Sequence, residues 1–198
     1  MLQTRLLLAS SSPYRRELLT RLGLPFTCAS PDIDESPALG ESPEALAVRL
    51  AETKAQALAA THQGHWIIGS DQVAALSDGT LLSKPGTYSK ACQQLERSSG
   101  QSVSFLTGLA LLDAYSGKLQ SCCEHFTVHF RELTAREIEA YLHKEEPYNC
   151  AGSFKMEGLG ITLFRELQGR DPNSLIGLPL IALNNMLIAW GRNPLLEP

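Results

Sequence analysis

Long apolar runs are absent from this sequence of 198 residues. No run approaches the roughly 20 apolar residues that a membrane-spanning helix requires. The N-terminal stretch MLQTRLLLASSSPYRR has too short an apolar part for the hydrophobic region of a secretory signal. We therefore expect no membrane partner, a cytoplasmic location, and an N-terminus that is part of the fold.

An excess of basic residues is absent as well. The chain has 17 lysine and arginine residues against 21 aspartate and glutamate residues, which gives a formal net charge of -4. Such a chain has no general electrostatic attraction to nucleic acids or anionic membranes, and no basic platform with aromatic side chains is evident. We expect no nucleic-acid partner, so any phosphate binding must depend on local groups.

Paired cysteines are lacking too. The five cysteines are odd in number and include an adjacent pair, which is a poor basis for a disulfide framework and indicates a reducing compartment: Cys28, Cys92, Cys122, Cys123 and Cys150. Zinc sites need spaced cysteine or histidine pairs. His125 and His129 would lie together on a helix, but their segment EHFTVHF alternates like a strand. A metal site shared by these two histidines is therefore not expected.

Apolar runs bounded by capping and turn residues predict the elements of the fold. Ser12 and Ser42 are suited to cap helices, each with a proline at the first helical position, and Thr134 with Glu137 forms a capping box. The expected helices are residues 12–23, 42–60, 88–100, 134–146 and 178–190. The expected strands are residues 6–9, 25–30, 65–76, two within 102–133, and 161–167. The segment TLLSKP follows residues 65–76 after a turn. The segments YNCAGSFKMEGLG and GRDPNSLIG are expected to be a loop and a turn.

The order of these elements favours an α/β fold. Residues 102–133 divide around Ser116-Gly117, which predicts a hairpin of two long strands. The mixture of strands and helices predicts an elongated mixed sheet flanked by helices, with a cleft between two lobes. Residues 1–198 are expected to form one domain.

The first candidate site lies where the N-terminal strand meets its helix. Backbone N–H groups and the positive end of a helix form a natural site for an anion. Ser10 and Ser12 add hydrogen-bond donors, and Arg15 could hold a phosphate through two hydrogen bonds. A capped surface helix with solvated arginines is the alternative.

Carboxylates provide the second candidate site. Asp71 comes directly after the apolar run WII, at the end of a buried strand, where α/β proteins tend to bind ligands. Glu35 lies in the acidic segment PDIDES. Two carboxylates beside a polyphosphate would suit Mg²⁺ or a similar divalent ion. A capped turn at Asp71 and a solvated acidic loop are the alternatives.

Isolated lysines and a glycine-rich segment complete the candidates. Lys54 interrupts an alanine-rich helical stretch, and Lys84 precedes Pro85. Both could bind phosphate, or both could be solvated surface charges. In YNCAGSFKMEGLG the small residues allow a close backbone approach, and Lys155 and Glu157 could point the same way. The alternative there is a plain loop.

The segments LLLASSSPYRRELL, GSDQV, SKP, CAGSFKMEGLG and DPNSLIGLPL together resemble the Maf-like nucleotide pyrophosphatases, in matching order and over nearly the whole chain. The resemblance implies hydrolysis of a nucleoside triphosphate to its monophosphate and pyrophosphate, a divalent metal cofactor, a mixed α/β fold with a cleft, and often a homodimer. It assigns Asp71 as the proton acceptor, with Glu35 as a further metal ligand. Four positions match those associated with phosphate binding: Ser10, Arg15, Lys54 and Lys84.

Within this family, GSDQV and SFKMEG look most like the subgroup that acts on 7-methyl-GTP, whereas dTTP/UTP-type members read more like ADT at the first segment. The subgroup's specificity positions correspond to Tyr14, Gln72 and Glu157. An aromatic face such as Tyr14 can stack on the cationic ring of 7-methylguanine, although tryptophan is more usual there. Glu157 could accept hydrogen bonds from the N1–H and amino group of guanine.

We therefore expect a 7-methyl-GTP pyrophosphatase. A carboxylate is a weak base at neutral pH, so activation of water by Asp71 needs help from a metal. The alternatives are a Maf-type pyrophosphatase for dTTP, UTP or other modified nucleotides, and a nucleotide-binding regulator that does not hydrolyse its ligand.

Overall fold

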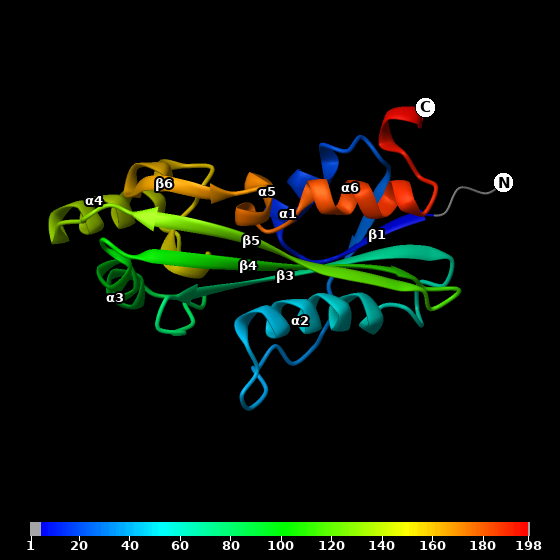
Figure 1. Cartoon of the computed structure of the whole chain (residues 1–198), viewed down its shortest axis with the longest axis horizontal. Coiled ribbons are helices and arrows are strands. Elements are labelled where there is room, and N and C mark those ends of the chain that lie inside the picture. The colour runs from blue at the N-terminus through cyan, green and yellow to red at the C-terminus, as the bar shows by residue number, and fades with distance from the viewer. Residues whose placement is uncertain (1–4, 198) are drawn as a thin grey trace.

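A computed structural model describes residues 5–197, so residues 1–4 and 198 of the predicted domain lie outside the described residues. A six-stranded sheet runs through the molecule with helices on both faces (Figure 1). Its strands are β1 (Arg5–Ala9), β2 (Phe26–Ala29), β3 (His65–Leu76), β4 (Ser102–Asp113), β5 (Leu119–Phe130) and β6 (Phe164–Gly169). The α-helices are α1 (Pro13–Thr20), α2 (Pro43–Ala57), α3 (Tyr88–Ser98), α4 (Ala135–Glu145), α5 (Pro172–Ile176) and α6 (Leu180–Ala189).

The sheet is mixed, as the order of elements predicted. Its strand order is β2-β1-β3-β4-β5-β6. Strand β1 runs parallel to both β2 and β3, whereas β3, β4, β5 and β6 pair in antiparallel fashion. The predicted hairpin is β4 and β5, each 12 residues long. Because β3, β4 and β5 are all long, they extend beyond β1 and β2 and connect two groups of helices.

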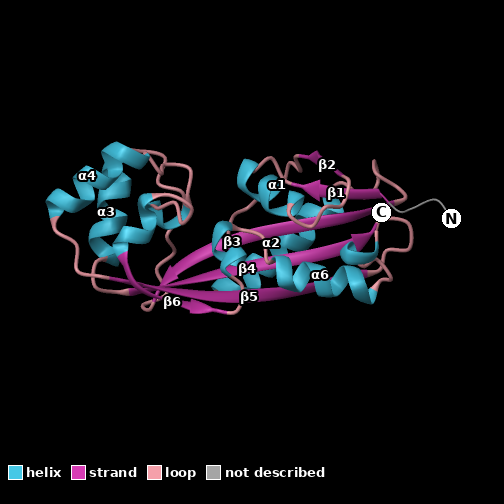
Figure 2. Cartoon of the chain, turned by 90° about the horizontal axis from the view of Figure 1, so that it is seen from above, coloured by secondary structure: helices cyan, strands magenta, loops and turns pink. Residues whose placement is uncertain are grey.

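These two groups form the expected lobes (Figure 2). The first lobe contains β1, β2, α1, α2, α5 and α6 around one end of the long strands. The second lobe contains α3, α4 and the segment of residues 146–163 around the other end. We use the names first lobe and second lobe in this sense below.

Alternation of side chains along the strands builds a core on each face of the first lobe. Leu6 and Leu8 pack with α1 and α6, while Leu7 and Ala9 pack with alanines of α2. The period of two residues therefore buries both faces of β1. Helix α2 contributes small side chains on its packed side, Ala51 among them, which permits a close approach to the sheet.

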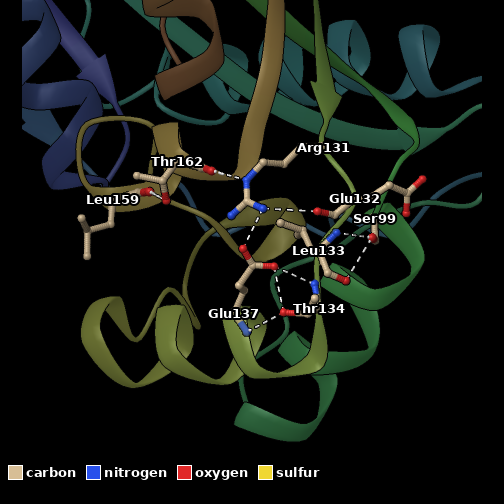
Figure 3. Close-up of polar contacts among 8 residues, drawn as sticks. All are labelled: Ser99, Arg131, Glu132, Leu133, Thr134, Glu137, Leu159 and Thr162. Atoms are coloured by element: carbon tan, nitrogen blue, oxygen red, sulfur yellow. Dashed lines mark hydrogen bonds and ion pairs between the residues drawn. The ribbon is translucent and has the colours of Figure 1, made fainter.

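Local capping signals were read correctly from the sequence. Ser12 and Ser42 each accept a hydrogen bond from the backbone N–H three residues later, and prolines occupy the first helical positions. The capping box of Thr134 and Glu137 is complete at the start of α4. Figure 3 shows how Arg131 extends this box by contacting Glu137 at 2.8 Å and the carbonyl oxygen of Thr162 at 2.7 Å. The second lobe is thereby tied to the end of β5.

Three local features differ from the sequence-based expectation. The start of β6 was misplaced, because residues 159–163 form a 3₁₀ turn and the strand begins only at Phe164. The loop GRDPNSLIG contains the short helix α5, which Asp171 caps. The segment TLLSKP gives a single bridge between Ala75 and Leu81. Over the described chain, no helix is long and apolar enough to cross a membrane.

Candidate active site

A cavity of about 710 Å³ is lined by residues of both lobes. Every site residue predicted from the sequence lines this cavity: Ser10, Tyr14, Arg15, Glu35, Lys54, Asp71, Gln72, Lys84 and Glu157. These residues come from the turn between β1 and α1, from α1, the acidic segment, α2, β3, the segment after β3 and the loop of the second lobe. Folding therefore brings together groups that are up to 147 positions apart in the chain, from Ser10 to Glu157.

Lys54 joins the two predicted metal-binding carboxylates. Its Nζ lies 2.6 Å from Oδ1 of Asp71 and 2.6 Å from Oε1 of Glu35. The Lys54 ammonium is buried among these partners, and the Asp71 side chain is only 12% exposed. The two carboxylate oxygens consequently lie within twice the Nζ–O distance of each other and face one point. This convergence is what a small oxygen-preferring cation requires from its protein ligands.

Two glycines allow α2 to bring Lys54 to this point. A Cβ on Gly69 would lie 2.0 Å from the carbonyl oxygen of Ala51, and one on Gly108 would lie 2.0 Å from that of Ala47. Gly108 is the register partner of Asp71 on β4. The missing side chains let the helix backbone rest directly on the sheet beside the carboxylate.

Arg15 and Ser10 form the adjoining wall. Nε of Arg15 donates to the carbonyl oxygen of Gly177 at 2.8 Å, and the buried Ser10 hydroxyl accepts from the backbone N–H of Ser12. Burial lowers the pKa of Arg15, while the charges of Asp71 and Glu35 act in the opposite direction. The guanidinium thus lies in the field of both carboxylates and is held by a backbone carbonyl. We call Ser10, Arg15, Glu35, Lys54 and Asp71 the carboxylate side of the cavity.

The charge of Lys84 also affects the pKa of Glu35. Burial by itself would raise the pKa of Glu35, but the hydrogen bond and charge of Lys54, together with the charges of Lys84 and Arg15, lower it overall. Three cations from separate segments therefore act on one carboxylate, and Lys54 contacts it directly. Such an arrangement has positive charge available for a polyphosphate once the carboxylates have a metal ion between them.

Gln72 has a further structural role that the sequence did not indicate. Its Nε2 donates to the carbonyl oxygens of Ser174 at 2.8 Å and Leu175 at 3.0 Å. Thr107 also donates to the carbonyl oxygen of Ser174 at 2.9 Å. Gln72 therefore holds α5 against the long strands, and its amide N–H groups are engaged in doing so.

Tyr14 faces the loop of the second lobe. Burial raises the pKa of the Tyr14 hydroxyl, and so do the neighbouring thiol of Cys150 and carboxylate of Glu157. The pKa of the Cys150 thiol is raised by burial and by Glu157. We call Tyr14, Asn149, Cys150, Lys155 and Glu157 the loop side of the cavity; all of them line it.

Aromatic packing supports the loop side. The ring of Phe154 packs edge-to-face on Phe105, Phe130 and Phe164, with centroids 5.3, 5.9 and 4.8 Å away. Gly152 has a φ of +74°, and a Cβ there would lie 3.1 Å from the Phe105 ring. The glycine of CAGSF therefore permits both the turn and the close ring contact.

Lys155 is anchored on α4. Its Nζ donates to the carbonyl oxygen of Glu145 at 2.5 Å, and its backbone N–H donates to the Tyr141 hydroxyl at 3.0 Å. These bonds fix the loop just before Glu157. The sequence suggested that Lys155 and Glu157 could point the same way, but the structure directs the Lys155 ammonium to the end of α4.

Sequence reasoning missed the part played by Gly177 and Asp171. The carbonyl oxygen of Gly177 accepts from both Arg15 and Ser70. The fully buried Asp171 accepts from Asn173 at 2.9 Å and from Ile181 at 2.8 Å, which joins the starts of α5 and α6. The signal was present in the segment DPNSLIGLPL, but its contacts are long-range and cannot be read from spacing.

A protein-family model matches most of this chain. Residues 5–190 match the model described as Maf-like protein, which is nearly the whole described chain. The chain belongs to the Maf-like family. The resemblance to this family, inferred from five short segments, is confirmed.

Curated relatives are similar to this chain over almost their entire length. A protein of Pseudomonas fluorescens (strain Pf-5) and one of Pseudomonas syringae pv. tomato (strain DC3000) are each 62% identical over 186 residues, covering 94% of this chain and 96% of theirs. A protein of Pseudomonas savastanoi pv. phaseolicola matches to the same extent. All three carry the name 7-methyl-GTP pyrophosphatase.

Solved structures with some likeness include a HAM1 protein from Coxiella burnetii, with a TM-score of 0.47 and 17% identity over 65% of this chain and 73% of that chain. The Ham1 protein of Staphylococcus aureus has a TM-score of 0.43 and 13% identity over 64% of this chain and 71% of its own.

Proposed function

We propose that this protein hydrolyses 7-methyl-GTP to 7-methyl-GMP and pyrophosphate in the cavity described above. The observation that carries the reaction class is the convergence of Glu35, Lys54 and Asp71 beside Arg15. Membership of the Maf-like family supports the same class. The choice of 7-methyl-GTP is supported by relatives of that name at 62% identity.

A divalent metal ion fits the carboxylate side. Glu35 and Asp71 present oxygens to one point, and Mg²⁺ commonly binds one or two carboxylates together with phosphate oxygens. These two residues would hold the ion, and Lys54 would give up at least one of its carboxylate contacts. The bound ion would neutralise phosphate charge and make a water molecule more acidic.

The carboxylate side then has a role for each group in phosphoryl transfer. Arg15, Lys54 and Lys84 bind the triphosphate, with Ser10 and the N-terminus of α1 beside them. Asp71 accepts the proton of water as the water oxygen attacks the α-phosphorus. The bond from that phosphorus to the bridging oxygen breaks, and pyrophosphate leaves with its charge near Lys54 and Lys84.

The loop side selects the base. The Tyr14 ring stacks on the cationic 7-methylguanine, because a positive ring is attracted to an aromatic face. Glu157 accepts hydrogen bonds from the guanine edge. Gln72 acts less directly, by holding α5 at the cavity wall through Ser174 and Leu175.

The test is a panel of 7-methyl-GTP, GTP, dTTP and UTP, assayed with Mg²⁺ or Mn²⁺ for pyrophosphate and nucleoside monophosphate. We expect 7-methyl-GTP to have the highest kcat/KM and chelation of the metal to abolish turnover. In water enriched in ¹⁸O, the label should enter 7-methyl-GMP, because attack is on the α-phosphorus.

Three results would contradict the proposal in different ways. Equal turnover of dTTP and 7-methyl-GTP would reject the substrate assignment while keeping the reaction class. Label in pyrophosphate would reject attack at the α-phosphorus. Tight nucleotide binding without pyrophosphate release over many turnovers would favour the non-hydrolysing regulator.

The homodimer and the cytoplasmic location remain predictions of the family resemblance and of the sequence. Sedimentation equilibrium of the purified chain, with and without nucleotide, tests the first. A homodimer should give twice the mass of the 21.6 kDa chain.

A further inference from the structure

Three possible metal ligands meet outside the cavity, where the start of α2 faces β5. They are the carboxylate of Glu44, the thiol of Cys123 and the imidazole of His125, whose ligand atoms all lie within 4.8 Å of one another. None of the three lines the cavity. No metal site was expected for His125 with His129; in the structure His125 lies beside Cys123 on the same face of β5.

The geometry of this cluster comes from rigid elements. Cys123 and His125 are two residues apart on β5, so their side chains point to one face of the sheet. Glu44 is in the first turn of α2, which lies along one face of the long strands (Figure 1). The hydroxyl of Ser121, two residues before Cys123, donates a hydrogen bond to Glu52, which lies eight residues after Glu44 on α2. Helix α2 and strand β5 therefore contact each other at two places along their length, and all three residues of the cluster lie on these two elements.

The distance between two of the ligand atoms matches the ligand spacing around a tetrahedral ion. Nε2 of His125 lies 3.3 Å from Oε1 of Glu44. Two ligands held at about 2.0 Å from a tetrahedral zinc ion are separated by about 3.3 Å. A thiolate, an imidazole and a carboxylate form a mixed donor set that suits Zn²⁺ and is unlike the oxygen ligands preferred by Mg²⁺.

The surroundings favour a cation. The Glu44 carboxylate provides negative charge beside the Cys123 thiol, and an ion at the cluster would replace the thiol proton. The side chains of Glu44 and His125 are each 57% exposed, so an ion can enter from solvent.

We propose that Glu44, Cys123 and His125 form a zinc-binding site that joins the start of α2 to β5. Water would complete the coordination. Because α2 also carries Leu46, Leu50 and Lys54 of the cavity wall, the ion would stabilise the helix on which the carboxylate side depends. This site is separate from the metal site proposed for Glu35 and Asp71.

The test uses the full chain under reducing conditions with excess Mg²⁺ present. Titration with Co²⁺ should give one equivalent of binding and a thiolate-to-cobalt charge-transfer band, which Zn²⁺ then removes by displacement. Cys123→Ser should lose the band, and His125→Gln and Glu44→Gln should weaken binding. Zn²⁺ should raise Tm by several degrees in the wild type, but not in Cys123→Ser.

Matched controls lie on the same strand and in the cavity. Cys122→Ser and His129→Gln change the same residue types on β5 outside the cluster and should keep the band. Cys150→Ser removes the cysteine that lines the cavity and should also keep it. Absence of a charge-transfer band in the wild type, or a band that survives Cys123→Ser and disappears in Cys122→Ser or Cys150→Ser, would overturn the proposal.

Discussion

The two sides of the cavity are built differently. On the carboxylate side, Asp71 lies on a central strand and Lys54 on a helix that rests on the sheet through Gly69 and Gly108. On the loop side, Cys150 and Glu157 lie in an irregular segment fixed by the Phe154 ring and by bonds to α4. Asp71 and Lys54 are thus held by regular elements, whereas Glu157 lies in a loop, where a change of residue is more easily tolerated. We expect substitutions on the carboxylate side to remove turnover and substitutions on the loop side to change which base is accepted.

The largest expected effect is at Asp71. Asp71→Asn should lower kcat by about 10²- to 10⁴-fold, because the amide cannot accept the proton of water. The change is nearly isosteric, so the folded state should persist. Single-turnover assays with 7-methyl-GTP, together with a thermal melt, measure both properties.

Asp78→Asn is the matched control for this prediction. Asp78 lies in the exposed turn after β3, the strand that carries Asp71. The Asp78→Asn substitution should leave kcat unchanged. If Asp71→Asn keeps turnover close to that of the wild type, Asp71 is not the proton acceptor.

The next largest effect is expected where α2 makes its close contact with the sheet. Gly108→Ala would place a Cβ 2.0 Å from the carbonyl oxygen of Ala47, and the backbone of α2 would have to move. Overpacking of this kind costs about 1–3 kcal/mol of unfolding free energy. Because α2 carries Lys54, both Tm and kcat should fall.

Gly117→Ala separates these two effects. Gly117 is in the hairpin turn with a φ of +73°, and an added Cβ has nothing within 4 Å. This variant should lower Tm through backbone strain while leaving kcat unchanged. A Gly108→Ala enzyme with reduced Tm but full kcat would show that the carboxylate side tolerates a displaced helix.

The loop side should give a smaller and selective effect. Tyr14→Leu removes the aromatic face and should lower kcat/KM for 7-methyl-GTP by about 2- to 30-fold, equivalent to about 0.5–2 kcal/mol. The kcat/KM for GTP should change less, because its base is uncharged. Tyr14→Phe keeps the ring and should retain the preference. Equal losses for both nucleotides would exclude stacking on a cationic base.

The smallest effect concerns the helix that supports the loop side. The pKa of Glu137 is lowered to about 2, chiefly by hydrogen bonds from Thr134 and then by Arg131. A lowered pKa contributes stability that is present above the unfolded value of about 4.3 and is lost as the pH falls toward 2.

The Tm difference between the wild type and Glu137→Gln should therefore shrink as the pH is lowered from 5 to 2. Glu96→Gln, at an exposed position of α3, is the control and should show no such convergence. A constant difference between the wild type and Glu137→Gln would mean that the carboxylate charge does not stabilise α4.

How far the sequence predicted the fold depended on the range of the contacts involved. The starts of α1, α2 and α4 were predicted because a cap involves residues within one turn of each other. The hairpin of β4 and β5 followed from a turn between alternating strands. By contrast, the 3₁₀ turn before β6 and the short helix α5 were missed, because contacts with Arg131 and Gln72 come from distant segments.

For the candidate site, the sequence by itself determined the residue types: an acid after an apolar run, a lysine in an alanine-rich helix and an arginine at a helix start. These depend on local pattern, and family resemblance joined them. Only the tertiary structure decided that Lys54 lies between Glu35 and Asp71, and that Gly177 holds Arg15. It also decided that Cys123 and His125 meet Glu44. The contacts of Lys54 and Glu44 depend on how closely α2 approaches the sheet. That approach is set by Gly69 and Gly108, which are distant in the sequence and have no side chain to keep the helix away.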